Sequence, residues 1–285
     1  MVYLDAFTIP DYDAECSFFQ DQKMTCYTTF YPFGVFSERE VPTLTFEPVT
    51  FLYGGNGSGK TTLINIIAET IGATRGAPYN KSSFFGNYIA YCNARWHYDT
   101  PDQDSTVITS DDVFDYIFNI RAMNEGIDTR RMVLSDEYLQ MKYSHFQMRS
   151  LDDYEQLKKI NDSRRKSRSG YIRNSLINNL PEQSNGQSAL MYFSNKIQSN
   201  QVYLLDEPEN SMSAEFQMEL ARFIEDSARF YNCQFIIATH SPFLLAVNHA
   251  RIYDLDSDPV TAKKWTELAN IRRYYDFFMD HKDEF

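Results

Sequence analysis

Short runs of apolar and β-branched residues alternate with segments of helical periodicity along this chain of 285 residues. The short runs predict buried strands at residues 49–53, 107–109, 201–205 and 234–239. A helix is predicted directly after the first strand, to about Ile71, and the clearest helical spacing covers residues 214–230. Strands and helices that alternate on both sides of a helical middle are typical of an α/β sheet with a helical insertion.

The remaining segments have weaker patterns. Residues 1–53 contain short aromatic and β-branched runs separated by prolines, which predicts antiparallel strands joined by turns. Residues 72–105 have little periodicity, whereas Asp112 to about Ile160 has helical spacing with many charges. We therefore predict one domain over residues 1–285, with a helical subdomain inserted at residues 110–182.

A glycine-rich segment follows the first predicted strand and has the order Gly-x-x-x-x-Gly-Lys-Thr over residues 54–61. Such glycines let the backbone turn tightly and direct its N–H groups toward phosphate oxygens, at the N-terminus of the helix that follows. A chance turn with a lysine is the other interpretation, but the strand before it and the helix after it favour a phosphate loop. The residues predicted to bind nucleotide here are Gly54, Asn56, Gly57, Ser58, Gly59, Lys60, Thr61 and Thr62.

Two acidic residues end the strand predicted at 201–205. Asp206 stands at its carboxyl end, where it would hold Mg²⁺ through water together with the Thr61 hydroxyl, while Lys60 reaches the β- and γ-phosphates of ATP. Glu207, the next residue, is placed to polarise the attacking water. Adjacent carboxylates also occur in ordinary acidic turns, but their position downstream of a phosphate loop favours the catalytic interpretation.

Two further segments carry polar groups that suit a phosphate. His240 follows the strand at 234–239, where a γ-phosphate sensor would lie, although a histidine just past a core strand is usually structural. Ser184, Gly186 and Gln187 precede an apolar helical stretch, and Ser-x-x-Gln in that place is also a capping box. A capped helix N-terminus can itself bind phosphate, so the two interpretations share the same physics. The presence of the other three motifs in order favours a second phosphate-binding signature here.

The order of these motifs resembles an ABC-type ATPase, and in particular the small stand-alone ATPases grouped with the SMC, RecF and OLD-family heads. The resemblance implies a P-loop NTPase fold, with a mixed central sheet, N-terminal antiparallel strands and a helical insertion. It also implies a homodimer in which two subunits sandwich two ATP molecules, each signature capping the γ-phosphate bound by the other subunit. Asn210-Ser211-Met212-Ser213 would then be the D-loop that crosses the dimer.

Two features depart from this family pattern. No glutamine follows the strand at 107–109, where such families place a residue that contacts Mg²⁺; Ser110, Asp111 and Asp112 stand there instead. The helical middle is also too short for the long coiled coil of SMC-type proteins. An aromatic residue from the first strands is expected to stack on adenine, and each candidate also suits the core: Tyr31, Phe33 and Phe36.

Composition restricts the possible partners and the cellular compartment of the protein. A formal net charge of −12 makes the chain a poor candidate for binding DNA over its whole surface, although a local basic patch could still bind it. The basic cluster at 164–168 is the one conspicuous candidate for such a patch, and we favour a solvated loop or helix face for it. The four scattered cysteines indicate reduced thiols and a cytoplasmic location. No stretch of about 18 apolar residues predicts a transmembrane segment, and the first residues lack the order of a signal peptide.

The leading hypothesis is an ATPase whose dimerisation is switched by ATP, acting on nucleic acid or an effector protein in DNA-related or phage-defence processes. The nucleotide-binding subunit of an ABC transporter is the main alternative. A nuclease, suggested by Asp254, Asp256 and Asp258, is disfavoured because these carboxylates fit an acidic turn and few residues follow them. A non-hydrolysing ATP switch is disfavoured by the presence of Glu207 and His240.

Overall fold

The computed structural model describes residues 1–22, 26–37, 39–97, 104–147, 150–181 and 183–285. The chain forms two compact units. The first unit contains Met1–Val113 together with Asn185–Phe285, and the second contains Phe114–Ser184. The bounds 110–182 for an inserted subdomain stay a prediction, and Glu182 itself lies outside the described residues.

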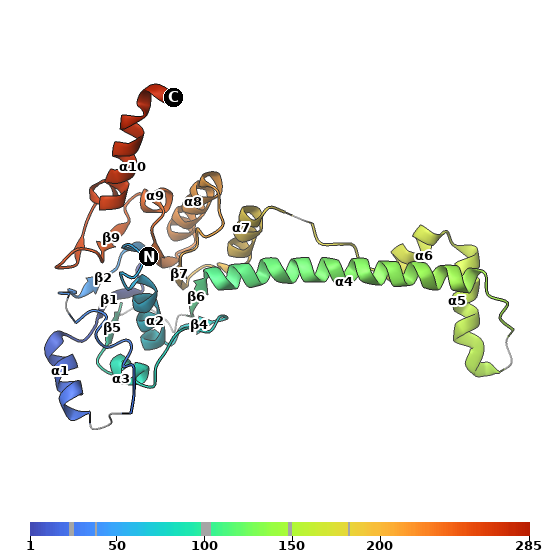
Figure 1. Ribbon diagram of the computed structural model, residues 1–285, viewed down its shortest axis with the longest axis horizontal. Coiled ribbons are helices and arrows are strands. Elements are labelled where there is room, and N and C mark those ends of the chain that lie inside the picture. Colours follow the sequence, from blue (N-terminus) through green and yellow to red (C-terminus); the bar gives the residue numbers. More distant parts are fainter. Residues whose placement is uncertain (23–25, 38, 98–103, 148–149, 182) are drawn as a thin grey trace. The chain divides into compact units, whose positions relative to one another are not determined.

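A seven-stranded sheet forms the centre of the first unit (Figure 1). Its strands lie in the order β10 (Thr261–Ala262), β9 (Arg251–Asp254), β3 (Val49–Tyr53), β8 (Gln234–Thr239), β7 (Val202–Asp206), β6 (Ser105–Thr109) and β4 (Thr74–Arg75). All neighbours pair in parallel except β10, which is antiparallel to β9. The four strands predicted from apolar runs are confirmed, and their carboxyl ends meet at one edge of the sheet, where α/β folds bind ligands.

A smaller antiparallel sheet consists of β2 (Leu44–Thr45), β1 (Leu4–Thr8) and β5 (Asn93–Trp96). Antiparallel strands over residues 1–53 are thus confirmed for β1 and β2, but the prediction is wrong for β3, which lies inside the parallel sheet. It also missed the helix α1 (Tyr12–Asp21). The carboxylate of Asp11 accepts the backbone N–H of Ala14 at 2.9 Å, and this N-cap starts a helix within an aromatic-rich segment.

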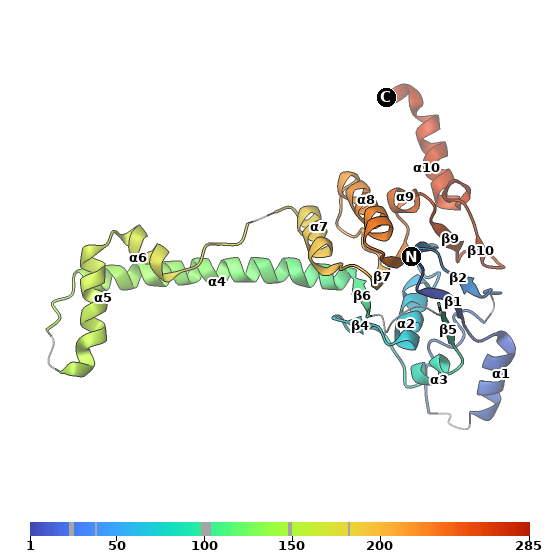
Figure 2. The ribbon, with the colours of Figure 1, turned by 180° about the vertical axis from the view of Figure 1, so that it is seen from behind.

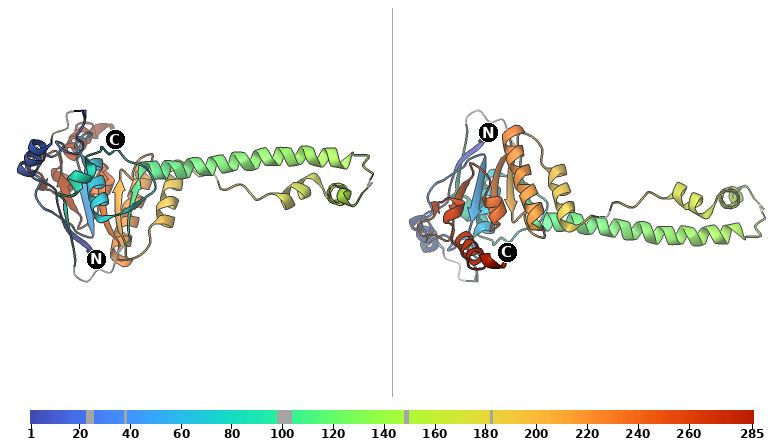
Figure 3. Two further views of the ribbon diagram at one scale, coloured as in Figure 1. Left: turned by 90° about the horizontal axis from the view of Figure 1, so that it is seen from below. Right: turned by 90° about the horizontal axis from the view of Figure 1, so that it is seen from above.

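Helices cover both faces of the seven-stranded sheet (Figure 3). On one face α2 (Lys60–Ile71) contacts β7 and β8, and on the other α8 (Ala214–Phe230) contacts β3 and β8. Because α2 also contacts β5 of the smaller sheet (Figure 2), it is apolar on several sides, and Leu63, Ile64, Ile66 and Ile67 are fully buried. Further helices of this unit are α3 (Phe85–Ile89), α7 (Asn185–Lys196), α9 (Pro242–Leu245) and α10 (Ala269–Asp280), with 3₁₀ turns at Trp265–Glu267 and Lys282–Glu284.

The second unit is helical. The helix α4 (Ser110–Lys142) begins in the first unit and continues into the second, which also contains a 3₁₀ turn (Leu151–Asp153), α5 (Tyr154–Arg165) and α6 (Arg168–Ser175). The helical spacing predicted from Asp112 to about Ile160 corresponds to two helices, since α4 ends at Lys142 and α5 begins at Tyr154. The Ser144 hydroxyl donates to the Met141 carbonyl at 2.9 Å, which satisfies one of the acceptors left open at the helix end.

Within the second unit, Leu134, Tyr138 and Tyr171 form a small buried cluster. The basic cluster predicted at 164–168 lies at the end of α5 and the start of α6, where Arg164 and Arg165 fall in the last helical turn. Positive charge is favourable at a helix C-terminus. No helix of the described segments is both long and apolar enough to span a membrane.

Candidate nucleotide-binding and hydrolysis site

The glycine-rich loop connects β3 to α2, as the sequence predicts. Gly57 and Gly59 have φ angles of 80° and 96°, a left-handed conformation that favours glycine. A Cβ atom on Gly54 would overlap the Ser58 hydroxyl, and one on Gly59 would come within 2.9 Å of the Phe36 ring. Close approach and backbone conformation therefore both require glycine in this loop.

Lys60 is the first residue of α2, and its side chain lies inside the loop rather than in solvent. It is only 5% exposed, and its ammonium donates to the carbonyl oxygens of Gly54 at 2.8 Å and Gly55 at 2.9 Å. These bonds hold the positive charge at the helix N-terminus, where an anion is favoured. The arrangement fits a phosphate group, whose oxygens would accept from this ammonium and from the loop N–H groups.

The other predicted loop residues have different surroundings. Asn56 is exposed, whereas Ser58 is buried, and its hydroxyl is without a hydrogen-bond partner within the described part of the chain. Thr62 accepts a hydrogen bond from the Tyr31 hydroxyl at 3.1 Å. The unpartnered Ser58 hydroxyl inside the loop is a donor that an anion would satisfy.

Asp206, the last residue of β7, lies opposite the phosphate loop. The Thr61 hydroxyl donates to its carboxylate at 3.1 Å. Burial raises the pKa of Asp206 to about 6; Thr61 and Lys60 act in the opposite direction, and the charges of Glu207 and Glu209 add to the rise. A carboxylate that is buried among other carboxylates gains most from a cation, so the Thr61–Asp206 pair fits the predicted Mg²⁺.

Replacing Asp206 with asparagine should stabilise the nucleotide-free protein at about pH 8. The raised pKa means that the folded state binds a proton more tightly than the unfolded chain, so stability falls as the pH rises from about 4 to 6. Above pH 6 the charged carboxylate lowers the free energy of unfolding by at most about 3 kcal/mol, and at pH 5 by about half as much. Thermal unfolding of both proteins should show a larger gain in Tm at pH 8 than at pH 5; an equal gain would contradict a burial effect.

Glu207 follows Asp206 and has an unusual backbone conformation, with φ at 48°. Its N–H donates to the Ala238 carbonyl at 2.9 Å, which ties the residue to β8, and its carboxylate accepts from the Asn210 amide at 3.2 Å. The side chain is 29% exposed, so one edge of the carboxylate is accessible. An accessible carboxylate on a fixed backbone can take a proton from water.

His240 comes directly after β8, beside the end of β7. Its Nδ1 atom lies 3.9 Å from the Glu207 carboxylate and 3.6 Å from that of Glu209. The parallel register that pairs Asp206 with Ala238 brings these side chains together from segments about 30 residues apart. The predicted site residues on the phosphate loop, β7 and β8 therefore meet at one edge of the sheet.

A pocket of about 700 Å³ opens beside Thr61, Thr62 and Asp206. Ser110 and Asp111 line it, whereas Asp112 turns toward Thr109 and accepts from its N–H and hydroxyl at 2.8 and 2.9 Å. Of the residues that replace the family glutamine, Ser110 and Asp111 thus face the pocket. Of the adenine-stacking candidates, Tyr31 lines this pocket, while Phe33 and Phe36 are buried in the core.

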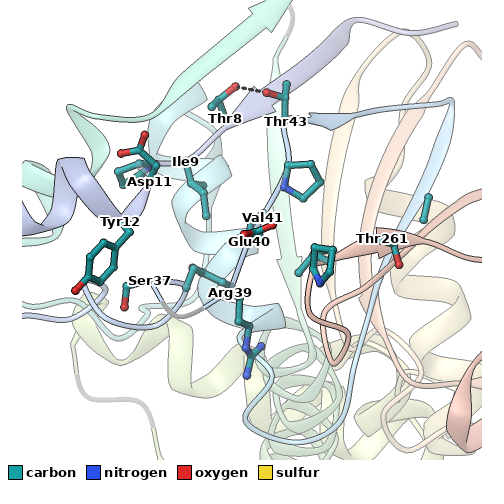
Figure 4. Close-up of a pocket in the computed structure, with 16 residues that line it drawn as sticks. Thr8, Ile9, Asp11, Tyr12, Ser37, Arg39, Glu40, Val41, Thr43 and Thr261 are labelled. Carbon is teal, nitrogen blue, oxygen red and sulfur yellow. Dashed lines mark hydrogen bonds between the residues drawn. The ribbon is translucent and has the colours of Figure 1, made fainter.

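A second pocket, of about 970 Å³, lies between the smaller sheet and the β9–β10 turn (Figure 4). Arg39 points from this pocket toward the phosphate loop, where its guanidinium donates to the Ser58 carbonyl at 2.7 Å and to the Leu255 carbonyl at 2.9 Å. Sequence patterns do not single out Arg39, because its partners are backbone atoms far away along the chain.

The signature segment lies at the start of α7. Ser184 precedes the helix and is exposed, as is Gln187. Gly186 is buried, and a Cβ atom on it would come within 2.5 Å of the Phe216 ring of α8. Any side chain at this position, as in Gly186→Asp, must therefore displace Phe216. As far as the chain is described, none of the three lines either pocket above.

The alternate aspartates have structural partners. Asp256 accepts the Gly55 N–H of the phosphate loop at 2.7 Å, and Asp254 accepts from Lys263 at 2.7 Å. Within the described residues, no group of three or more His, Cys, Asp or Glu side chains is arranged to hold a metal ion. An acidic turn that supports the phosphate loop explains these residues better than a nuclease site.

The comparisons with known proteins agree with this geometry. A family model described as "ABC transporter" matches residues 43–210, more than half of the chain. The chain belongs to this ABC family. A second model, described as "AAA domain, putative AbiEii toxin, Type IV TA system", matches residues 177–246 of this ABC ATPase. The comparison with curated proteins gave no match.

Three solved structures resemble the ABC ATPase at low identity. The Smc head domain of Pyrococcus furiosus, with an extended coiled coil and bound to the ScpA C-terminal domain, has 10% identity and a TM-score of 0.41, covering 82% of this chain and 94% of that one. An inward-facing metal-chelate-type ABC transporter has 17% identity and a TM-score of 0.38, covering 80% and 76%. A dimeric ATP-binding cassette bound to ADP and Pi has 12% identity and a TM-score of 0.36, covering 78% and 88%.

The family match confirms the predicted resemblance, the P-loop α/β fold class and the activity. The protein is an ATPase that binds ATP and hydrolyses it to ADP and phosphate. Three residues that contact this site were not predicted to belong to it: Glu209, Arg39 and Asp256. Glu209 and Asp256 had a local signal, since each belongs to an acidic turn after a strand, whereas Arg39 had none.

Proposed function

We propose that this ABC ATPase works as a switch, in which two copies enclose ATP between them and hydrolysis releases the dimer. The observation that carries the proposal is the convergence of Lys60, Asp206, Glu207 and His240 at the carboxyl edge of β3, β7 and β8. These groups supply a phosphate-binding cation, a carboxylate for a metal ion, a proton acceptor and a polar ring. A phosphate-binding cation, a metal ligand and a group that positions water are the parts that phosphoryl-transfer sites share, and the ring can contact the terminal phosphate.

Each residue has a separate role in the proposed reaction. The loop N–H groups and Lys60 bind the β- and γ-phosphates, and Thr61 with Asp206 holds Mg²⁺, which neutralises phosphate charge. Glu207 orients the attacking water and accepts its proton, and His240 contacts the γ-phosphate. The signature residues Ser184, Gly186 and Gln187 of one copy close the site of the other.

We place the ATPase in the cytoplasm, acting on an effector protein or nucleic acid in DNA-related or phage-defence processes. Support for a defence role comes from the second family match, whose description names a toxin and which spans α7, β7 and β8. The four free thiols support a reducing compartment. Purifying Glu207→Gln protein with ATP from its native host, and identifying what remains bound, tests this setting; loss of the bound molecule without ATP is the expected control result.

A nucleotide-binding subunit of a transporter is the second candidate, because the family model that covers most of the chain is described as an ABC transporter. It predicts that the Glu207→Gln protein co-purifies with a membrane protein in an ATP-dependent manner. Recovery of an effector protein or nucleic acid instead supports the switch.

The substitution Ser184→Asp tests the shared site. Aspartate caps a helix about as well as serine does, so the start of α7 should be retained, whereas its negative charge should repel a partner's γ-phosphate. We expect ATP affinity within about twofold of wild type, because the subunit's own phosphate loop is intact, and a loss of turnover of about tenfold or more. ATP binding by calorimetry and phosphate release measure the two effects.

The matched control is Ser194→Asp, which adds the same charge to an exposed serine near the other end of α7 and should leave turnover unchanged. Mixing Ser184→Asp with Lys60→Ala subunits should restore activity. One site of the mixed dimer combines the intact phosphate loop of the Ser184→Asp subunit with the intact signature of the Lys60→Ala subunit. Full activity of Ser184→Asp alone would reduce the segment to a helix cap.

A further inference from the structure

Glu209 is a buried acid in the turn that follows β7. Its side chain is 4% exposed, and one carboxylate oxygen, Oε1, accepts from the Thr239 hydroxyl at 2.6 Å and from the His240 N–H at 3.1 Å. The other oxygen, Oε2, is buried and has no hydrogen-bond partner among the described residues. Burying a carboxylate is costly unless donors surround it, so this position needs an explanation beyond packing.

The Oε1 atom of Glu209 also faces the imidazole ring of His240. Oε1 lies 3.6 Å from Nδ1, closer than the Glu207 carboxylate at 3.9 Å. Both carboxylates lie on the Nδ1 side of the ring, and the surroundings of one ring nitrogen set how the other is used. Nε2, on the opposite edge of the ring, is then left for a ligand.

The His240 ring is accessible to solvent, although Glu209 is not. Glu209 and His240 line one cavity of about 540 Å³, and the His240 side chain is 46% exposed whereas Glu209 is buried. Glu209 thus fixes the backbone of His240 through a hydrogen bond, while the His240 ring borders the cavity. A fixed acid behind an accessible histidine is the arrangement that orients an imidazole in many active sites.

We propose that Glu209 is a positioning residue for ATP hydrolysis, holding the His240 backbone and ring so that Nε2 faces the terminal phosphate of bound ATP. The proposal rests on the proposed contact between His240 and the γ-phosphate. Glu209 itself touches neither ATP nor water in this scheme. Its effect on turnover passes entirely through His240.

The test is a double-mutant cycle between Glu209→Gln and His240→Ala. Glutamine keeps the size of the side chain and an oxygen acceptor for Thr239 and the His240 N–H, but it removes the charge beside Nδ1. We expect Glu209→Gln to lower kcat about tenfold with KM for ATP within about twofold. In the His240→Ala background the same change should have no further effect, because the residue through which it acts is gone.

The outcomes distinguish the contact between His240 and the γ-phosphate from the positioning role of Glu209. If His240→Ala alone keeps full turnover, the contact between His240 and the γ-phosphate is wrong. If His240→Ala is impaired but Glu209→Gln lowers kcat equally in both backgrounds, Glu209 acts independently of His240 and the positioning role is overturned. Glu219→Gln, at an exposed acid on α8, should be neutral. Should Glu209→Gln fail to fold, Glu209→Asp replaces it in the cycle, and its smaller loss must also vanish without His240.

Discussion

Replacing Lys60 with alanine should nearly abolish ATP binding. The ammonium is held by the Gly54 and Gly55 carbonyls inside a buried loop, at a helix N-terminus that already favours anions. Removing one partner of a buried charge pair costs about 3–5 kcal/mol, so affinity should fall about 100-fold or more. Calorimetric titration with ATP and Mg²⁺ measures the change.

The control for this substitution is Lys196→Ala, which removes an exposed lysine from the last turn of α7 and should leave affinity unchanged. The loop carbonyls that Lys60 satisfies lose two donors in the mutant, so a thermal unfolding curve should accompany the titration. Wild-type affinity in a folded Lys60→Ala protein would show that the phosphate loop has been misassigned.

Replacing Glu207 with glutamine should separate binding from hydrolysis. Glutamine retains an acceptor for the Asn210 amide at 3.2 Å and leaves the backbone bond to Ala238 in place, so the site keeps its shape. It cannot accept the proton of the attacking water, and turnover should fall about 100-fold or more. ATP that is bound but not hydrolysed should then hold the two subunits together.

Two measurements check this expectation. Phosphate release reports turnover, and sedimentation with ATP and Mg²⁺ should show a larger species for Glu207→Gln than for wild type. The double variant Lys60→Ala/Glu207→Gln should remain small, because its sites hold no nucleotide. Undiminished hydrolysis in Glu207→Gln would exclude Glu207 as the proton acceptor, and an unchanged sedimentation coefficient would contradict the ATP-enclosing dimer.

Local patterns were sufficient for the central strands and for the phosphate loop. The runs at 49–53 and 234–239 are apolar because both faces of a parallel sheet are covered by helices, so their composition predicts their position directly. The loop that follows β3 is equally local, since its glycines are needed for the backbone conformation of the loop itself. The helix over 214–230 was predictable from one apolar face.

The sequence by itself therefore determined the central strands, the phosphate loop and the family, because each depends on residues that are neighbours in the chain. Only the tertiary structure decided which side chains meet. Glu209 reaches Thr239 and His240 across the β7–β8 pairing, Gly186 packs on Phe216, and Arg39 holds the Ser58 carbonyl. Such contacts join residues about 20 to 30 positions apart, and no periodicity within one element records them.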